Sequence, residues 1–157
     1  MDFKVPRGGS AICHIDVYPV EPVNGSAQNW KMVNTSVEPP QELDTLEISF
    51  ALASTPQQRQ SERMILVFSI ADAVQTAADS WRFAQGGTMY CEGKADYLND
   101  IDFELSGDGK VLTASIQCLT DIPEAFNFSF LAIRRDNKSG ECHLFSSADP
   151  GGGVRRL

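Results

Sequence analysis

Apolar and polar residues alternate along most of the chain with a period of two. The even-numbered residues are apolar over residues 46–52 and again over 112–118, and the residues between them are mostly polar or small. Three phenylalanines share one face in the same way over residues 126–130. Because this period is that of a β-strand with one buried face, we predict strands over these segments. Further strands are expected at residues 12–18, 30–35, 80–84, 88–93, 103–105 and 142–146.

One predicted strand departs from this alternation. Residues 64–70 are apolar almost throughout, which predicts a central strand covered on both faces. Turn signals separate the strands: Asp108-Gly109 and residues 136–140 each predict a hairpin, and Gly86-Gly87 predicts a third bend. Short strands with regular turns and no long helical period predict an all-β fold, an antiparallel immunoglobulin-like β-sandwich.

The remaining segments connect the strands. The alanines of residues 71–80 tolerate a helix, so at most one short helix, of a turn or two, is expected there. Three polar or proline-rich stretches are predicted loops: residues 19–29, 37–42 and 54–63. The chain shows no internal repeat, and we predict a single domain over residues 1–157, with 1–10 and 150–157 as flexible or edge segments.

The chain ends on an Asp-Pro pair, three glycines and Val-Arg-Arg-Leu. Proline lacks an N–H group, so Pro150 is expected where the strand at 142–146 has ended. The glycines let the backbone take conformations that other residues avoid. Residues 154–157 are then expected to resume as a short edge strand or to fray.

This C-terminal pattern resembles that of a known family. The residues that match are Phe128-Ser-Phe-Leu-Ala, Gly140 and Ser147-Ala-Asp-Pro150, and the Glu-Pro pairs at Glu21 and Glu38 are a looser echo. The pattern is similar to that of the DP-EP family of small bacterial β-sandwich proteins and, as a second choice, the inclusion-body protein family. The resemblance implies an immunoglobulin-like sandwich and no catalytic residues.

Composition and charge narrow the expected partners. The 157 residues are 42% hydrophobic and 22% charged, as in soluble globular proteins, and the net charge is -8. An acidic surface repels phosphate groups and anionic lipids, so neither nucleic acid nor membrane is expected as a partner. The first residues lack the apolar stretch of a secretory signal, which predicts a cytoplasmic location.

Two Cys-His dipeptides carry both histidines of the chain, in Cys13-His14 and Cys142-His143. If their strands were neighbours, the sulfur and nitrogen atoms would suit a soft metal ion. Neighbouring residues of a strand point to opposite faces, however, so each dipeptide offers at most one ligand to a face. The alternative is that the thiols are buried and structural.

A second candidate metal site is the acidic stretch at residues 96–108, where Asp100, Asp102 and Asp108 are candidate calcium ligands. No glycine follows Asp102 where an EF-hand loop needs one, and Asp102 alternates with apolar neighbours. The alternative is the solvated outer face of a strand.

Aromatic residues near predicted strand ends are candidates for ligand binding. Trp30, Trp81, Tyr90 and Tyr97 are placed to stack on a sugar or another small molecule. The alternative is that these rings close the open ends of the sandwich, since large aromatic side chains also fill cores.

No spacing typical of a catalytic site occurs, because G-x-S-x-G, a glycine-rich phosphate loop and H-x-H are all absent. We therefore predict a non-catalytic protein without a cofactor, which acts by self-assembly as a homo-oligomer or by contact with a protein partner. Two alternatives stay open: a small-molecule or carbohydrate-binding module, with or without calcium, and a metalloenzyme built on the Cys-His pairs.

Overall fold

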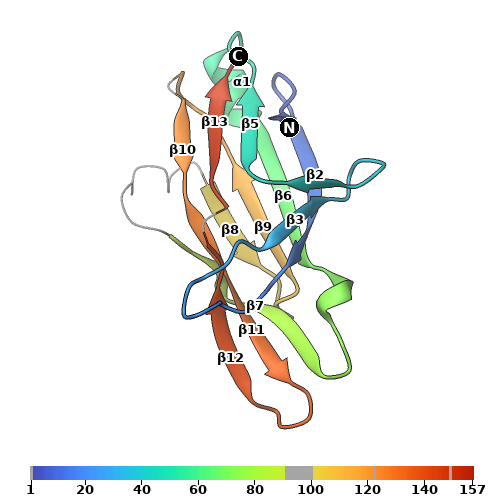
Figure 1. Cartoon of the computed structure of the whole chain (residues 1–157). Coiled ribbons are helices and arrows are strands. Elements are labelled where there is room, and N and C mark those ends of the chain that lie inside the picture. The colour runs from blue at the N-terminus through green and yellow to red at the C-terminus, as the bar shows by residue number, and fades with distance from the viewer. Residues whose placement is uncertain (1, 91–100, 122, 149) are drawn as a thin grey trace.

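The computed structural model describes residues 2–90, 101–121, 123–148 and 150–157 of the chain. Its strands form three sheets (Figure 1), and the prediction of an all-β protein is confirmed. The largest sheet contains six strands, which are β2 (Ser10–Tyr18), β3 (Lys31–Asn34), β4 (Gln41–Leu43), β6 (Arg63–Ile70), β8 (Ile101–Leu105) and β9 (Val111–Ile116). Their spatial order is β4-β3-β2-β6-β9-β8.

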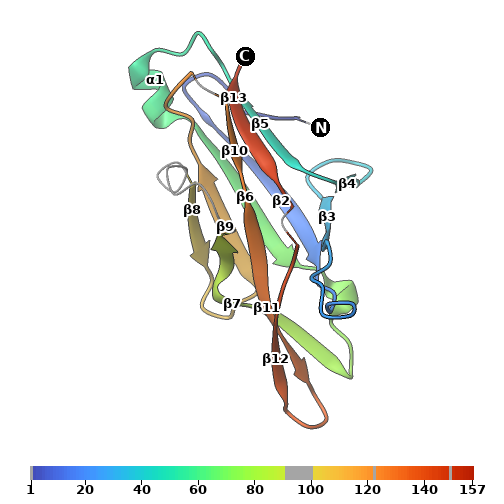
Figure 2. The same cartoon turned by 60° about the vertical axis from the view of Figure 1, so that its left-hand side comes forward.

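Two smaller sheets make up the second layer. The four-stranded sheet contains, in spatial order, β1 (Asp2–Lys4), β5 (Leu46–Phe50), β13 (Gly152–Arg156) and β10 (Glu124–Phe126). The three-stranded sheet contains, in spatial order, β12 (Cys142–Ser146), β11 (Phe128–Asp136) and β7 (Asp79–Tyr90). Figure 2 shows β10 running on into β11, so that the two sheets follow one another along the molecule.

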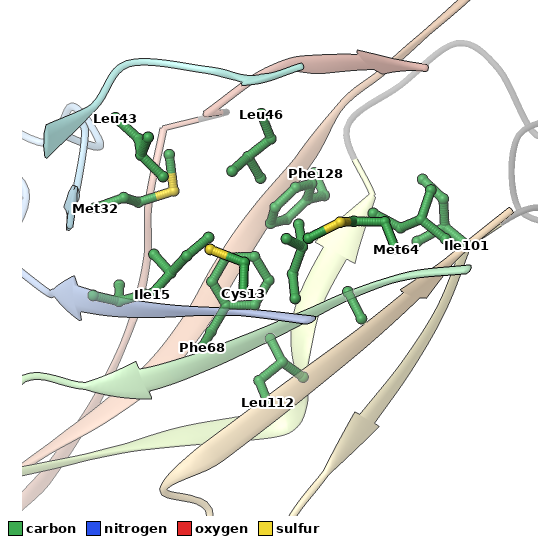
Figure 3. Packing of buried hydrophobic residues seen from close by; sticks show 14 of the residues in the cluster. Cys13, Ile15, Met32, Leu43, Leu46, Met64, Phe68, Ile101, Leu112 and Phe128 are labelled. Carbon is green, nitrogen blue, oxygen red and sulfur yellow. The ribbon is translucent and has the colours of Figure 1, made fainter. Parts of the chain in front are cut away.

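Buried rings join the two layers. The ring centroid of Phe130 on β11 lies 5.1 Å from that of Phe68 on β6, and Trp30 stacks on Phe130 at 6.2 Å. Figure 3 shows Phe68 of the six-stranded sheet pointing toward Leu46 and Phe128 of the opposite layer. The apolar faces that the alternation predicts on β5, β9 and β11 therefore meet in one core.

The predicted antiparallel arrangement is wrong for three strand pairs. β2 pairs with β6 in parallel, and β5 pairs in parallel with both β1 and β13. The alternation of apolar residues predicts which face of a strand is buried, but it carries no information on the direction of the neighbouring strand. The sheets are mixed, and the antiparallel immunoglobulin-like sandwich is not confirmed.

The outer face of β6 is less covered than predicted. The even-numbered residues of this strand are buried, whereas the odd-numbered ones, Ile65 and Val67 among them, are only half-buried. The prediction of a strand covered on both faces is therefore wrong. β-Branched side chains suit the open face of a pleated sheet, which explains an apolar run on a strand with one buried face.

Residues 54–63, predicted as a loop, contain the helix α1 (Pro56–Ser61). The Thr55 hydroxyl accepts a hydrogen bond from the Gln58 N–H at 3.2 Å, and the Gln58 side chain accepts one from the Thr55 N–H at 2.9 Å. This is a capping box with proline at the first helical position. None of the α1 residues is buried, so the helix lacks the apolar period by which helices are usually recognised.

Two further predictions concern residues 71–80 and Leu52. Residues 71–80 contain one 3-10 turn, η1 (Asp72–Val74), as the prediction of a turn or two allowed. Leu52, predicted to face inward, lies beyond the end of β5 and is 52% exposed.

Among the described residues, no helix has the length and apolar character needed to cross a membrane.

β7 is one strand where two were expected, at 80–84 and 88–93 with a bend at Gly86-Gly87, and residues 91–93 lie outside the described residues. Between the pairs Ala132–Phe83 and Phe130–Thr88, residues 84–87 of β7 face a single residue of β11. Gly87 has a φ of +85°, and an added Cβ atom there would lie 2.8 Å from Leu112. The glycine therefore permits a bulge, which interrupts the pairing without ending the strand.

The C-terminal segment is an internal strand, whereas the sequence predicted a flexible or edge segment. β13 lies between β5 and β10, and Gly152 pairs with Leu46 on one side and Phe126 on the other. A Cβ atom at Gly152 would lie 2.6 Å from the Leu46 carbonyl oxygen and closer still to the Phe126 ring. Only a residue without a side chain fits between these two strands at this point.

A buried ion pair holds the C-terminal end of β13 in place. The Arg156 guanidinium lies 2.9 Å from the Glu62 carboxylate, and both side chains have no exposed surface. Burial raises the pKa of Glu62, but hydrogen bonds from Gly8 and Ser54 and the charge of Arg156 together hold it below its ordinary value. The hydrogen bonds of the pair reach four other segments, at Gly8, Ala51, Ser54 and Cys118.

We expect Glu62→Gln to lower the free energy of unfolding by about 3 kcal/mol, because it leaves the Arg156 charge buried without a counter-charge. Adding Arg156→Met is expected to restore part of this loss, since neither charge is then buried. Urea denaturation measures both changes. The control Glu104→Gln alters an exposed carboxylate of β8 and should change stability by less than about 0.5 kcal/mol. Strictly additive losses would contradict the coupling.

Gly152→Ala is expected to lower the free energy of unfolding by about 3 kcal/mol, because the added methyl group overlaps the Leu46 backbone. Gly107→Ala is the matched control, since no described atom lies within 4 Å of a Cβ atom at that position. Thermal or urea unfolding of the two variants checks this expectation, and equal stabilities would disprove the close approach of the strands.

Candidate functional site

Among the described residues, none pairs with the backbone edge of β12 that faces away from β11, and we call this edge open. The Asp136 N–H donates to the Glu141 carbonyl at 2.8 Å. The Ser147 N–H donates to the Phe130 carbonyl at 3.0 Å. Because bonded pairs alternate along an antiparallel ladder, three residues of β12 direct their N–H and C=O groups away from β11, namely Cys142, Leu144 and Ser146. Within the described part of the chain, β11 is the one strand that pairs with β12.

The side chains at this edge are uncharged. Cys142 is exposed, Leu144 is 48% exposed, and Ser146 is half-buried. On the opposite face of the strand, the Phe145 ring lies 5.9 Å from the Trp81 ring, which anchors β12 to the core. The contact between Phe145 and Trp81 therefore holds β12 in place, and the side chain at the centre of its open edge, Leu144, is apolar.

The other edge of the same sheet, formed by β7, is covered. The Gln75 side-chain amide donates to the Trp81 carbonyl and accepts from the Trp81 N–H, each at 2.8 Å. Asp79 exchanges a similar pair of hydrogen bonds with Thr76, at 2.9 and 3.0 Å. A further strand cannot pair here without breaking these bonds.

The remaining edges are short or charged. β1, β4 and β10 have three residues each. β8 has five, but Asp102 and Glu104 are exposed on it, and like charges oppose the pairing of two identical edges. Of the edge strands in the described residues, β12 alone combines five residues with uncharged side chains and open backbone groups.

The predicted hairpin at residues 136–140 is confirmed, and it holds β12 against β11. The Asp136 carboxylate accepts hydrogen bonds from the N–H groups of Lys138 and Ser139, at 2.8 and 3.1 Å. These bonds lower the pKa of Asp136. Gly140 completes the turn with a φ of +76°.

The proposed soft metal site requires the strands of the two Cys-His pairs to be neighbours, and they are not. β2 lies between β3 and β6, whereas β12 lies beside β11 in another sheet. Cys13 is buried and its thiol donates to the Asn34 side chain at 3.1 Å, while His14 is exposed on the outer face. Burial raises the pKa of Cys13. His143 lies 3.8 Å from the Glu141 carboxylate, in the exposed hairpin.

The described candidate calcium ligands, Asp102 and Asp108, also have different structural roles. Asp108 accepts hydrogen bonds from the Ser106 hydroxyl at 2.6 Å and the Lys110 N–H at 3.0 Å, and these bonds lower its pKa. It therefore stabilises the predicted β8–β9 hairpin, which is confirmed. Asp102 is exposed on β8, and Asp100 lies outside the described residues. The described residues hold no group of three His, Cys, Asp or Glu side chains placed to bind a metal ion.

The two tryptophans are packed in the core. Trp30 and Trp81 are 4% and 7% exposed, their rings meet edge-on at 6.4 Å, and the Trp30 indole donates to the Val20 carbonyl at 3.0 Å. Their faces are therefore not open for stacking on a sugar, although Trp30 borders a cavity. Tyr90 ends β7, and Tyr97 lies outside the described residues.

Comparison with known proteins places the chain in a family. The model of the DP-EP family matches residues 9–156. The chain belongs to the DP-EP family. The match extends the resemblance at the C-terminus over nearly the whole chain, and within it Glu21 of the first Glu-Pro pair forms an ion pair with Arg134 of β11.

Among solved structures, the chain is similar to that of an inclusion body protein (PixA) from Burkholderia cenocepacia. The alignment covers 95% of this chain and 96% of that chain, with 8% sequence identity and a TM-score of 0.46. No curated protein sequence matches the chain.

In this DP-EP protein the β11–β12 hairpin is expected to lose stability in acid. The folded pKa of Asp136 lies below the unfolded value of about 3.9, so its contribution is complete above that value and is lost as the pH falls through the folded pKa. Asp136→Asn should therefore be less stable than the wild type at pH 7, with a gap that narrows below about pH 4. Thermal unfolding at a series of pH values measures the gap, with Asp102→Asn as the exposed control. A gap independent of pH would refute this role of Asp136.

Proposed function

We propose that this protein is non-catalytic and acts by self-assembly, through pairing of β12 with β12 of a second copy. The observation that carries the proposal is the open and uncharged edge of β12, on a sheet whose other edge is capped by Gln75 and Thr76. Strand edges of this kind accept a further strand through backbone hydrogen bonds.

The register of the pair follows from the residues that face outward. With Leu144 opposite Leu144 of the second copy, Cys142 lies opposite Ser146, and about six backbone hydrogen bonds form. The contact is twofold symmetric and uses the same strand of each copy, as in most homodimers. It joins two three-stranded sheets into one continuous sheet.

Charge supports this register. His143 lies opposite Phe145 of the second copy, and Glu141 lies opposite Ser147, so no two like charges face each other. The half-exposed Leu144 side chains meet at the symmetry axis beside Ile133 of β11, and apolar surface is removed from water there. A self-pairing β8 would instead bring Asp102 and Glu104 of both copies together.

A strand pair of this length buries less surface than the roughly 1,200 Å² of a stable interface, so we expect a dimer that forms at about 100 μM. Leu144→Lys should prevent it, because two ammonium groups would then meet at the axis. Sedimentation velocity across a concentration series measures the association, and circular dichroism checks that the variant is folded. Leu52→Lys changes a leucine of similar exposure elsewhere and is expected to dimerise as the wild type does.

Two outcomes would refute the proposal. One is a wild-type protein that remains monomeric to several times the expected concentration. The other is a Leu144→Lys variant that associates as strongly as Leu52→Lys, since the contact would then lie on another surface.

A further inference from the structure

A cavity of about 350 Å³ lies between the β3–β4 hairpin and the segment that follows β12. Small-molecule sites begin at about 300 Å³. Trp30, Met32 and Leu43 contribute its apolar lining, and Lys31, Asp44 and Ser147 are among its polar residues. Of these residues, Ser147 alone lies opposite a residue of the second copy in the dimer proposed above, and the others lie outside that contact.

The walls of the cavity are held in place by the fold. Met32 and Leu43 are paired across β3 and β4, both are buried, and Figure 3 shows their side chains next to each other. On the other side, the Ala148 N–H donates to the Gln28 carbonyl at 2.8 Å. The site is therefore preformed, which lowers the entropic cost of binding a ligand.

A buried hydroxyl lines the cavity. Ser147 is 2% exposed, and its Oγ atom accepts a hydrogen bond from the Phe130 N–H at 2.9 Å. A serine hydroxyl that accepts one bond keeps a proton to donate. It can therefore supply a hydrogen bond to an acceptor group of a ligand.

The charges at the mouth favour a cation. Glu42 lies 3.9 Å from the Lys31 ammonium group, which also lies 5.0 Å from the centre of the Tyr18 ring. Asp44 is exposed, and no described residue pairs with its carboxylate. Because the charges of Glu42 and Lys31 offset each other, Asp44 gives the described residues that line the cavity a net negative charge.

We infer that this cavity binds a small primary amine whose apolar body carries a hydrogen-bond acceptor. The ammonium group lies at Asp44, the apolar body rests against Met32 and Leu43, and the acceptor receives the Ser147 hydroxyl proton. The ligand replaces water in a cavity whose exposed lining is mostly polar, with a smaller apolar part at Met32 and Leu43.

The probe is 4-(aminomethyl)cyclohexanol, titrated by calorimetry and by the fluorescence of the nearby Trp30, at a protein concentration of about 20 μM, where the monomer prevails. We expect saturable binding with a Kd of about 1 mM, in line with a ligand of this size. The neutral isostere 4-(hydroxymethyl)cyclohexanol should bind roughly fivefold more weakly, because it lacks the charge that Asp44 attracts.

Three variants test the assignment. Asp44→Asn should weaken binding of the amine about fivefold and leave the neutral isostere unchanged. Ala148→Leu, which places a larger side chain in the cavity wall, should abolish binding of both. Glu104→Gln, on the opposite edge of the six-stranded sheet, should bind as the wild type does. The inference is overturned if binding does not saturate, if both probes bind equally, or if Ala148→Leu still binds the amine.

Discussion

The buried ion pair between Arg156 and Glu62 is the contact on which the arrangement of the second layer depends. Both side chains are removed from water, and neither charge is tolerable there without the other. The pair joins the last strand to the residue just before β6, and through Gly8 it also binds the N-terminal segment. These contacts hold the C-terminal strand in its place, where β13 pairs with β5.

The position of β13 has consequences for the rest of the layer. β10 pairs with its free side, and β11 continues from β10 past the end of the four-stranded sheet. The β11–β12 hairpin therefore extends away from the ion pair (Figure 1), with Phe130 and Phe145 packed against the tryptophans. At this end of the molecule the outer backbone edge of β12 is open, whereas side chains cover the outer backbone edge of β7. Such unequal treatment of two edges of one sheet is the physical basis of the proposed self-assembly.

Ser147, Ala148 and Pro150 come between β12 and β13 in the chain, and all three line the cavity beside the β3–β4 hairpin. Ser147 is both the last bonded partner of β11 and part of the cavity lining. The open edge and the cavity are thus adjacent, but they use different atoms. The edge uses outward backbone groups of β12, and the cavity uses side chains.

The sequence by itself determined most of the longer strands, the faces of β5, β9 and β11 that enter the core, and the two aspartate hairpins, because alternation and turn chemistry act between residues close in the chain. The sequence also contains the capping box of α1 at Thr55 and Gln58, which is overlooked when helices are sought by their apolar period. Only the tertiary structure decided the parallel pairs, the internal place of β13 and the packing of Trp30 against Trp81. It also decided that Gln75 covers one edge while Leu144 stays on an open one. These features depend on which distant segments meet, and a local pattern of side chains carries no information about that.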